Sequence, residues 1–231
     1  MKPNISVVMP AYNEEGNLGI AVEKAVKVLD DIADKYEIII VDDGSRDKTG
    51  EIAEVLSKKH KNVRVIHHKV NKGYGVSQKT GFSNARFEWI TLVPSDNQFD
   101  MGDMRRYIGL MDTADVIMGY RIRRRDSFIR RMNARIYWTG ISVLFFIPVH
   151  RDIDWVKFYR KEVLDSIDIG TDSAFADAEI IIKAHRKGFK IKEVGVPHYR
   201  RLKGKETGGD IRVIARQLFD LFKFRLGFRL K

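Results

Sequence analysis

Short, mostly apolar runs alternate with stretches of helical periodicity along the first half of the chain. The runs are Ile5–Met9, Glu37–Val41, Val63–Ile66, Trp89–Val93 and Asp115–Met118. After the first run, Leu18, Val22 and Leu29 recur at three- to four-residue steps or multiples of them, as in an amphipathic helix. Similar segments at 52–56, 76–85 and 101–111 predict further helices. Apolar strands that alternate with helices predict an α/β fold, with a mainly parallel sheet flanked by helices on both faces.

The alternation is lost after Gly119, and the second half of the chain predicts additions to the same domain. An aromatic helix carries Trp138, Phe145 and Phe146, which we expect to pack in the core. The alternative is a groove that binds a prenyl chain. A strand near Trp155–Tyr159 and a helix around Ala174–Lys187 follow without a linker or low-complexity stretch. We therefore expect one domain over residues 1–209, with halves at 1–120 and 121–209, and an amphipathic C-terminal helix over 210–231.

Composition excludes several classes of protein. None of the 231 residues is cysteine, which removes disulfide frameworks, thiolate catalysis, iron–sulfur clusters and cysteine-ligated zinc. The first strand pattern begins within five residues of the N-terminus, without the layout of a signal peptide. No apolar run approaches the roughly 18 residues that a membrane span requires. We expect a soluble or peripheral membrane protein.

The net charge of +11 is local. Residues 121–135 contain seven Arg and one Asp (+6), and residues 211–231 contain six Lys or Arg and one Asp (+5). The charges of these two segments add up to the net charge of the whole chain. They predict two surfaces that meet phosphate, anionic lipid or nucleic acid, with plain solvation as an equally weighted alternative.

Polar residues follow five successive strands. The segments are Pro10–Glu15, Asp42–Asp47, His67–Gly73, Pro94–Gln98 and Gly119–Arg121. Turn chemistry explains any one of them, but the carboxyl ends of parallel strands form one edge, where ligands bind. The glycine patterns of mononucleotide-binding ATPases and dinucleotide oxidoreductases are missing after every predicted strand. Asp96 and Gln98 instead offer two hard oxygen ligands for Mg²⁺ or Mn²⁺ beside a diphosphate.

These segments resemble the successive motifs of family 2 glycosyltransferases, above all the dolichol-phosphate mannosyltransferase branch that acts on polyprenyl phosphates. The motifs are Val7–Glu15, Ile40–Asp47, Asn71–Gly75 and Ser95–Gln98, continued by Gly119–Arg121, Asp177–Glu179, Gly188–Pro197 and Arg200–Gly204. The resemblance covers about residues 4 to 208. The first two motifs together are highly specific, whereas each alone is moderately so.

The resemblance implies a GT-A fold, an inverting transfer from a nucleotide sugar, and a divalent metal, Mg²⁺ or Mn²⁺. It places these residues at the nucleotide sugar: Pro10, Tyr12, Glu14, Asp43, Lys72, Gly73 and Asp96. Asp43 would hydrogen-bond the base or ribose. Asp96 matches the second Asp of the family's Asp-x-Asp motif, and Gln98 would join it as a metal ligand. Pro94 stands where the first Asp is expected, which leaves the donor's identity open.

The nature of the acceptor decides which catalytic residues are needed. A lipid phosphate is already anionic and needs cations rather than a base. The candidates are Arg121, Arg130, Arg131, Arg200, Arg201 and Lys205. A sugar hydroxyl would need a carboxylate base, for which Asp177 and Glu179 are the candidates. The competing explanation for that pair is two acidic residues that favour a helix N-terminus.

We expect a glycosyltransferase that acts on a polyprenyl, dolichyl-type phosphate as a peripheral protein at the cytoplasmic membrane face. The alternatives are transfer to a hydroxyl of a glycolipid or polysaccharide, and a non-catalytic sugar-nucleotide binder. Nucleic acid is disfavoured as a partner because the carboxylates at the strand ends would repel phosphate. The basic C-terminal helix predicts contact with a membrane surface, while packing on the core, a homodimer and a membrane-protein partner stay open.

Overall fold

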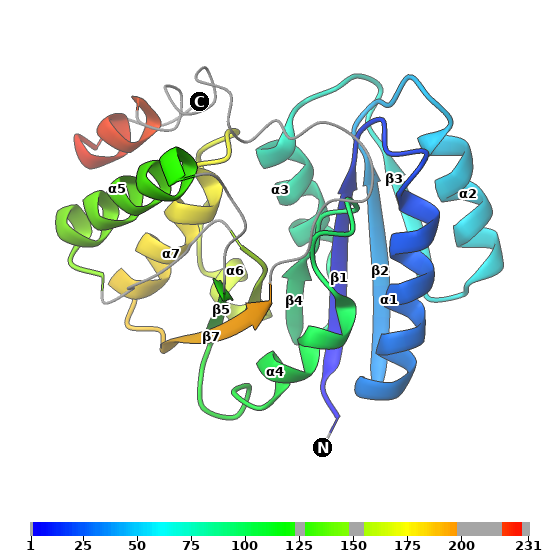
Figure 1. Cartoon of the computed structure of the whole chain (residues 1–231), viewed down its shortest axis with the longest axis horizontal. Helices are drawn as coiled ribbons and strands as arrows, with labels where there is room; N and C mark the ends of the chain where they lie inside the picture. Colours follow the sequence, from blue (N-terminus) through cyan, green and yellow to red (C-terminus); the bar gives the residue numbers. More distant parts are fainter. Residues whose placement is uncertain (1, 123–127, 148–154, 198–218, 228–231) are drawn as a thin grey trace.

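A computed structural model describes residues 2–122, 128–147, 155–197 and 219–227 of the chain. Its centre is one seven-stranded sheet of order β3-β2-β1-β4-β6-β5-β7 (Figure 1). The strands are β1 Asn4–Ala11, β2 Lys35–Asp42, β3 Val63–His67, β4 Trp89–Leu92, β5 Val116–Ile122, β6 Lys157–Arg160 and β7 Ile191–Pro197. The second half of the chain therefore extends the sheet that the first half begins.

All strands but one of this sheet run in the same direction. β1 pairs in parallel with β2 and β4, β2 with β3, and β5 with β7. β6 is antiparallel to both of its neighbours, β4 and β5. The predicted α/β class with a mainly parallel sheet is confirmed, but the reversed strand had no signal in the sequence.

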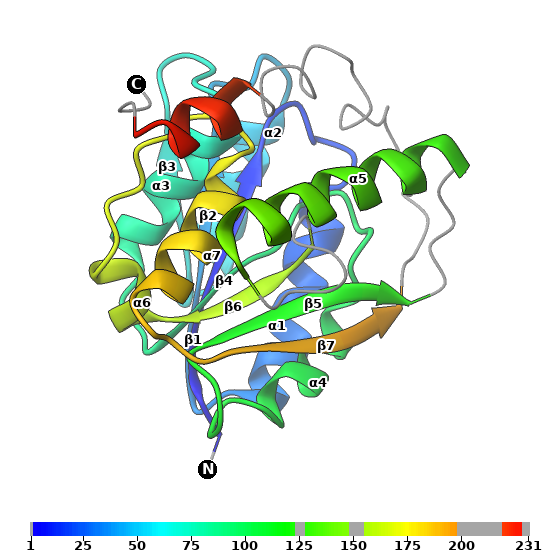
Figure 2. The ribbon, with the colours of Figure 1, turned by 90° about the vertical axis from the view of Figure 1, so that its left-hand side faces the viewer.

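Helices cover both faces of the sheet. They are α1 Leu18–Ile32, α2 Thr49–Lys59, α3 Tyr74–Asn84, the 3₁₀ turn η1 Met101–Asp103, α4 Met104–Ile108, α5 Phe128–Phe145, α6 Lys161–Asp165 and α7 Ala176–Arg186. Residues from α1, α2 and α4 join the core on one face, and residues from α3, α5, α6 and α7 join the core on the other. Figure 2 shows α5 and α7 over the part of the sheet that contains β5, β6 and β7.

Burial on both faces explains why the strands are apolar throughout. Val7 on β1 belongs to the core under α1, whereas the next residue, Val8, belongs to the core under α3. Neighbouring strand residues point to opposite faces, so a strand covered on both sides needs apolar residues at successive positions.

Two details differ from the sequence-based expectation. The continuous helix expected at 101–111 is a 3₁₀ turn followed by the short α4, and the segment contains Gly102 and Gly109, which disfavour a longer helix. Trp138 and Phe145 are buried as predicted, but the prediction for Phe146 is wrong, since its side chain is 85% exposed. The helix ends at Phe145, and Phe146 takes a left-handed conformation with φ of 55°.

The described part of the C-terminal segment packs against the core by one side. Residues 219–225 are helical, and Leu221 is buried. Phe224 contacts Phe145 of α5 and Phe175, with ring centroids 5.7 and 5.6 Å apart. The rest of the helix expected over 210–231 lies outside the described residues. Among the helices that the structure describes, none is both long and apolar enough to span a bilayer.

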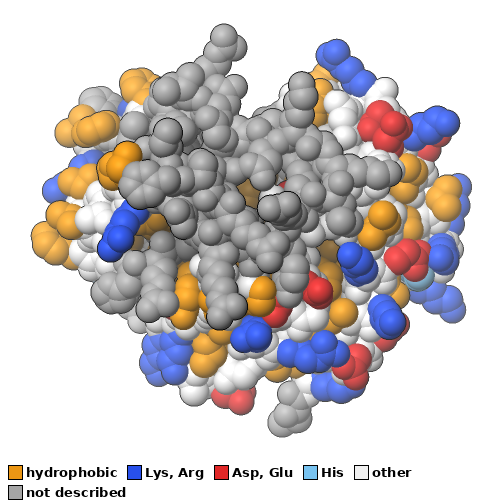
Figure 3. All heavy atoms as spheres, viewed as in Figure 1, with side chains coloured by type: hydrophobic (Ala, Val, Ile, Leu, Met, Phe, Trp, Pro, Cys, Tyr) orange, Lys and Arg blue, Asp and Glu red, His pale blue; other side chains and the backbone are white. Residues whose placement is uncertain are grey.

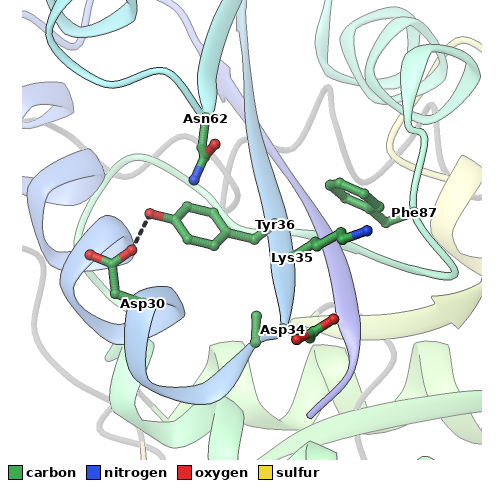
Figure 4. Close-up of a pocket in the computed structure, with 7 residues that line it drawn as sticks. Asp30, Asp34, Lys35, Tyr36, Asn62 and Phe87 are labelled. Atoms are coloured by element: carbon green, nitrogen blue, oxygen red, sulfur yellow. Dashed lines mark hydrogen bonds between the residues drawn. The ribbon is translucent and has the colours of Figure 1, made fainter.

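A hollow of about 400 Å³ opens at the amino-terminal edge of the sheet (Figure 4). It lies beside the first residues of β2, Lys35 and Tyr36, and the Tyr36 hydroxyl donates a 2.6 Å hydrogen bond to Asp30. Ligands of open α/β sheets bind at the opposite, carboxyl edge. We therefore place this hollow outside the candidate site.

The end of β3 predicts a pH dependence of stability. His67 lies 2.9 Å from Asp42 on β2 and 2.9 Å from Glu54 on α2. Hydrogen bonds to Asp42, the larger effect, and to Glu54 raise the pKa of His67 above its ordinary value of 6.5. Its protonated form therefore stabilises the fold below the unfolded-state pKa, and this contribution is lost as pH rises through the folded-state pKa.

We expect His67→Gln to lower the free energy of unfolding more at pH 5.5 than at pH 8.5. The side chain is 41% exposed, so screening by solvent keeps the effect below about 1 kcal/mol. Urea denaturation of both proteins at the two pH values measures it, with His185→Gln as the control. A difference that is constant with pH, or that grows at pH 8.5, contradicts the assignment.

Candidate active site

The candidate site lies at the carboxyl edge of the sheet, around the ends of β1 and β4. The chain leaves β1 for β2 and β3 on one side and returns to β4 on the other. Consecutive connections thus diverge between β1 and β4, which is the point where ligands bind in open α/β sheets. The polar segments that follow β1, β2, β3, β4 and β5 all lie at this edge, since these strands share one direction.

The loops that follow β1 and β2 are joined by hydrogen bonds. Asn13 accepts the Arg46 backbone N–H at 2.8 Å through its side chain, and its own N–H donates to the Ser45 hydroxyl at 3.1 Å. The Glu14 N–H donates to the Thr49 hydroxyl at 2.8 Å. Asn13 has φ of 54°, a conformation that Asn tolerates better than most residues. Sequence reasoning left Asn13 out of the site, although its place between Tyr12 and Glu14 was a signal.

Asp43 is engaged by its own chain. Its carboxylate accepts the backbone N–H groups of Lys72 and Gly73 at 2.9 and 2.8 Å, and lies 2.7 Å from Nδ1 of His68. The residue is 4% exposed, and Nε2 of His68 lies 3.0 Å from the Thr80 hydroxyl. Asp43 therefore holds the loop between β3 and α3 in place. The predicted contact of Asp43 with base or ribose stays a prediction.

Two motif glycines are required by close backbone approach. Gly44 has φ of 69°, and a Cβ at this position would lie 2.5 Å from the backbone of Val70. Gly75, in the first turn of α3, lies so close to the carbonyl of Asp172 that any Cβ would collide with it. Larger residues would push apart the loops that these glycines bring together.

The loop after β4 is fastened to the loop after β1. The Ser95 hydroxyl donates to the Pro10 carbonyl at 3.2 Å, and the Asn97 amide donates to the Asn17 carbonyl at 3.3 Å. Asp96 accepts the N–H of Gln98 at 3.0 Å, which fixes the turn that carries both side chains. The structure thus brings the two predicted metal ligands together on one partly exposed loop beside β1.

The donor chemistry of this loop fits Mg²⁺ or Mn²⁺. Asp96 and Gln98 offer a carboxylate and an amide oxygen, which are hard ligands. No group of three or more His, Cys, Asp or Glu residues suited to a metal occurs in the described part of the chain. The remaining ligands would come from a diphosphate and water, as is usual for Mg²⁺.

The two candidate bases on α7 have different surroundings. Glu179 is 1% exposed, and its carboxylate accepts the N–H groups of Gly170 and Thr171 at 2.9 Å each, as well as Nζ of Lys183 at 2.6 Å. These contacts hold the loop that precedes α7. A catalytic role for Glu179 stays a prediction, and its contacts favour a structural one.

Asp177 sits among groups from two other elements, α3 and β6. Its carboxylate accepts the Gln78 amide at 3.0 Å and the Tyr74 hydroxyl at 3.3 Å, both from α3, and lies 3.1 Å from Nζ of Lys157 on β6. Burial raises the pKa of Tyr159 well above 10, and the nearby negative charge of Asp177 adds to this. The side chain of Asp177 is 12% exposed, so this carboxylate is nearly enclosed by a polar cluster.

Sequence reasoning missed Lys157. The residue is only 4% exposed and donates to the Trp155 carbonyl at 2.9 Å as well as pairing with Asp177. Buried lysines are rare unless they are paired. The signal was a single Lys inside the apolar run Trp155–Tyr159.

Arg121 is the predicted phosphate-binding cation that the structure describes in full. It lies near the end of β5, at the same edge as the Asp96 loop, with its guanidinium 5.0 Å from the centre of the Trp155 ring. Arg130 and Arg131 lie on α5, and their side chains are outside the described part of the chain. Arg200, Arg201 and Lys205 lie wholly outside it.

Comparison with known proteins shows which family this chain resembles. The family described as Glycosyl transferase family 2 matches residues 6–168. A dolichyl-phosphate hexose transferase of Haloferax volcanii is 28% identical over 202 residues, which cover 86% of this chain and 84% of that protein. A dolichyl-phosphate beta-glucosyltransferase of Dictyostelium discoideum is 33% identical over 213 residues, 83% of this chain and 65% of that protein. The chain spans 32% of a third relative, glycosyltransferase AglD of Haloferax volcanii.

Solved structures show the same fold at low sequence identity. Glucosyl-3-phosphoglycerate synthase from Mycobacterium tuberculosis, in complex with Mn²⁺, UDP and phosphoglyceric acid, matches with a TM-score of 0.74 and 19% identity, over 98% of this chain and 79% of that one. Mannosyltransferase PcManGT from Pyrobaculum calidifontis, in complex with GDP-Man and Mn²⁺, has a TM-score of 0.68 and 16% identity, over 98% and 65% of the two chains.

The contacts of Asp43 generate a prediction. Asp43→Asn replaces one carboxylate oxygen by an amide that faces backbone N–H donors. Loss of a buried hydrogen bond of this kind costs about 1–3 kcal/mol, and we expect that decrease in the free energy of unfolding by urea denaturation. Asp165→Asn, at an exposed carboxylate on α6, is the control. Unchanged stability together with weaker binding of nucleoside diphosphate would instead assign Asp43 to the donor.

Proposed function

The chain belongs to glycosyl transferase family 2, and on that basis we propose that it transfers a hexose from a nucleotide sugar to a polyprenyl phosphate. Its GT-A fold, which the motifs implied, is confirmed by the structural likeness over 98% of the chain. One observation carries the proposal: the Asp96 loop and Arg121 lie at the same edge of the sheet. The relatives named for dolichyl phosphate support the class of acceptor.

We assign the donor to the ends of β1, β2 and β4. Pro10, Tyr12 and Glu14 would line its nucleoside pocket, and the side chain of Tyr12 is 40% exposed there. Lys72 and Gly73, which Asp43 holds in place, would border the same pocket. When bound between Asp96, Gln98 and the donor, Mg²⁺ or Mn²⁺ would neutralise the diphosphate that leaves.

The acceptor phosphate needs no base. One of its oxygens forms a bond to the anomeric carbon while the bond from that carbon to the diphosphate breaks, and the electron pair departs with the diphosphate. An approach from the face opposite the leaving group inverts the configuration. Arg121 would hold the acceptor phosphate, and Trp155 orients its guanidinium. We propose that the other predicted cations, Arg130, Arg131, Arg200, Arg201 and Lys205, contribute to the same subsite.

A second candidate function has its own observation. Asp177 is fixed by Gln78, Tyr74 and Lys157, so it is oriented as a general base would be. This arrangement favours a sugar hydroxyl as the acceptor. The relatives' names favour the phosphate, and we therefore rank the hydroxyl second.

The two acceptors predict different outcomes for Asp177→Asn. Transfer to a hydroxyl would fall by about 10²-fold or more without a base, whereas transfer to a short polyprenyl phosphate should fall far less. The measurement is lipid-soluble label from labelled nucleotide sugars, with a polyprenyl phosphate or a neutral glycolipid as acceptor and thermal melting as the check of folding. Label that appears with the glycolipid alone contradicts the proposal.

The metal assignment predicts an effect of Asp96→Ala on binding. We expect Mn²⁺-dependent binding of UDP or GDP, measured by calorimetry, to weaken at least tenfold with little change in melting temperature, because Asp96 lies on a partly exposed loop. Chelation by EDTA should weaken binding to the wild type equally. Asp100→Ala, which removes the same charge a few residues later, is the control. Full binding by Asp96→Ala would refute this metal site.

We also propose that the chain works at the cytoplasmic face of a membrane as a peripheral protein, because the prenyl chain of the acceptor is embedded in lipid. The amphipathic, basic C-terminal segment supports this placement. Nucleic acid is not part of the proposal.

A further inference from the structure

Helix α5 is apolar on two opposite faces. One face packs into the core through Trp138, Ile141 and Phe145. At about 100° per residue, Ile136 and Val143 fall on the other side of the helix, and they are 64% and 65% exposed. The outer side of a surface helix is normally polar, so this second apolar stripe needs another explanation.

The C-terminal helix repeats the pattern beside α5. Leu221 and Phe224 face the core, while Phe219, Phe222 and Leu226 are 58%, 61% and 70% exposed. The ring contact between Phe224 and Phe145 joins the two helices. We call the exposed apolar residues of both helices, together with the residue that follows each helix, the outer apolar face. It consists of Met132, Ile136, Val143, Leu144, Phe146, Phe219, Phe222 and Leu226.

Cations accompany the outer apolar face. The two segments that equal the net charge of +11, residues 121–135 and 211–231, contribute residues to the same two helices. Lys223 lies 4.5 Å from the ring of Phe219. Arg135 on α5 and Arg225 on the C-terminal helix are exposed. Figure 3 shows hydrophobic side chains with Lys and Arg among them at the left edge of the molecule, where Figure 1 places α5 and the C-terminal helix.

We propose that the outer apolar face is the surface by which this protein rests on an anionic lipid bilayer. Apolar stripes flanked by Lys and Arg suit the boundary between acyl chains and anionic headgroups. A second copy of the chain fits less well, because pairing this face with itself would bring two sets of cations together. The inference rests on the proposed function in that a polyprenyl acceptor lies in such a bilayer. It adds that the outer side of α5 contacts lipid.

The test compares two double variants of the full chain. Ile136→Glu with Val143→Glu alters the outer apolar face. Ile20→Glu with Val55→Glu makes the same substitutions on α1 and α2, at residues 44% and 64% exposed. Figure 1 shows these helices on the opposite side of the molecule from α5. The net charge falls by two units in both variants, so they differ only in where the substitutions lie.

Co-sedimentation with phosphatidylcholine vesicles that contain 30% phosphatidylglycerol measures the binding. We expect the α5 variant to partition at least tenfold more weakly than the wild type, and the α1/α2 variant to lose much less. Wild-type binding by the α5 variant, or equal losses by both variants, would overturn the proposal. So would a wild-type dimer that light scattering shows to dissociate in the α5 variant.

The binding assay contains neither donor nor acceptor, so it is independent of the proposed function. The α5 variant should still transfer sugar to a short, water-soluble prenyl phosphate at the wild-type rate. If the wild type fails in that transfer but the vesicle results hold, the proposed function falls and the lipid-binding face stands. If transfer occurs and the vesicle results fail, the reverse applies.

Discussion

Hydrogen bonds between loops at the carboxyl edge of the sheet are the constraint on which the site depends. The sheet is covered on both faces, so its polar chemistry is confined to the edge where the strands end. Asn13 binds the loop after β2, Asp43 binds the loop after β3, and Ser95 binds the end of β1. Each loop therefore owes its shape to a neighbour. The side chains proposed to meet the donor are held by residues that need not touch it, and Asp43 shows how a motif residue can serve that supporting purpose.

The fold could be predicted to the extent that it depends on local pattern. Strands buried on both faces produce continuous apolar runs in the sequence, and the helices around them produce apolar residues at regular helical spacing. The positions of β1 to β5 were therefore expected close to where the structure has them. The reversal of β6 depends on which strands it pairs with, which no local pattern records. Phe146 is an apolar residue of the kind expected in a core. Its positive φ ends the helix, however, and its side chain is exposed.

The site could be predicted at the level of loops but not of individual roles. Motifs and strand ends identified the loops that meet. Asp177 and Glu179 are two residues apart in one turn of α7, and their sequence surroundings do not distinguish them. Their difference comes from tertiary contacts: Glu179 meets backbone donors of the preceding loop, whereas Asp177 meets α3 and β6. Lys157 likewise belongs to the site because it pairs with Asp177, twenty residues later in the chain.

The position of β6 has a consequence for biosynthesis. This strand lies between β4 and β5, although it is made after both. A nascent or truncated chain that ends before residue 157 can pair β4 with β1 on one side, but it lacks the strand that pairs with the other side of β4. Open strand edges attract other chains and promote aggregation. Truncated forms of the chain that end before β6 would therefore be prone to join one another through this edge.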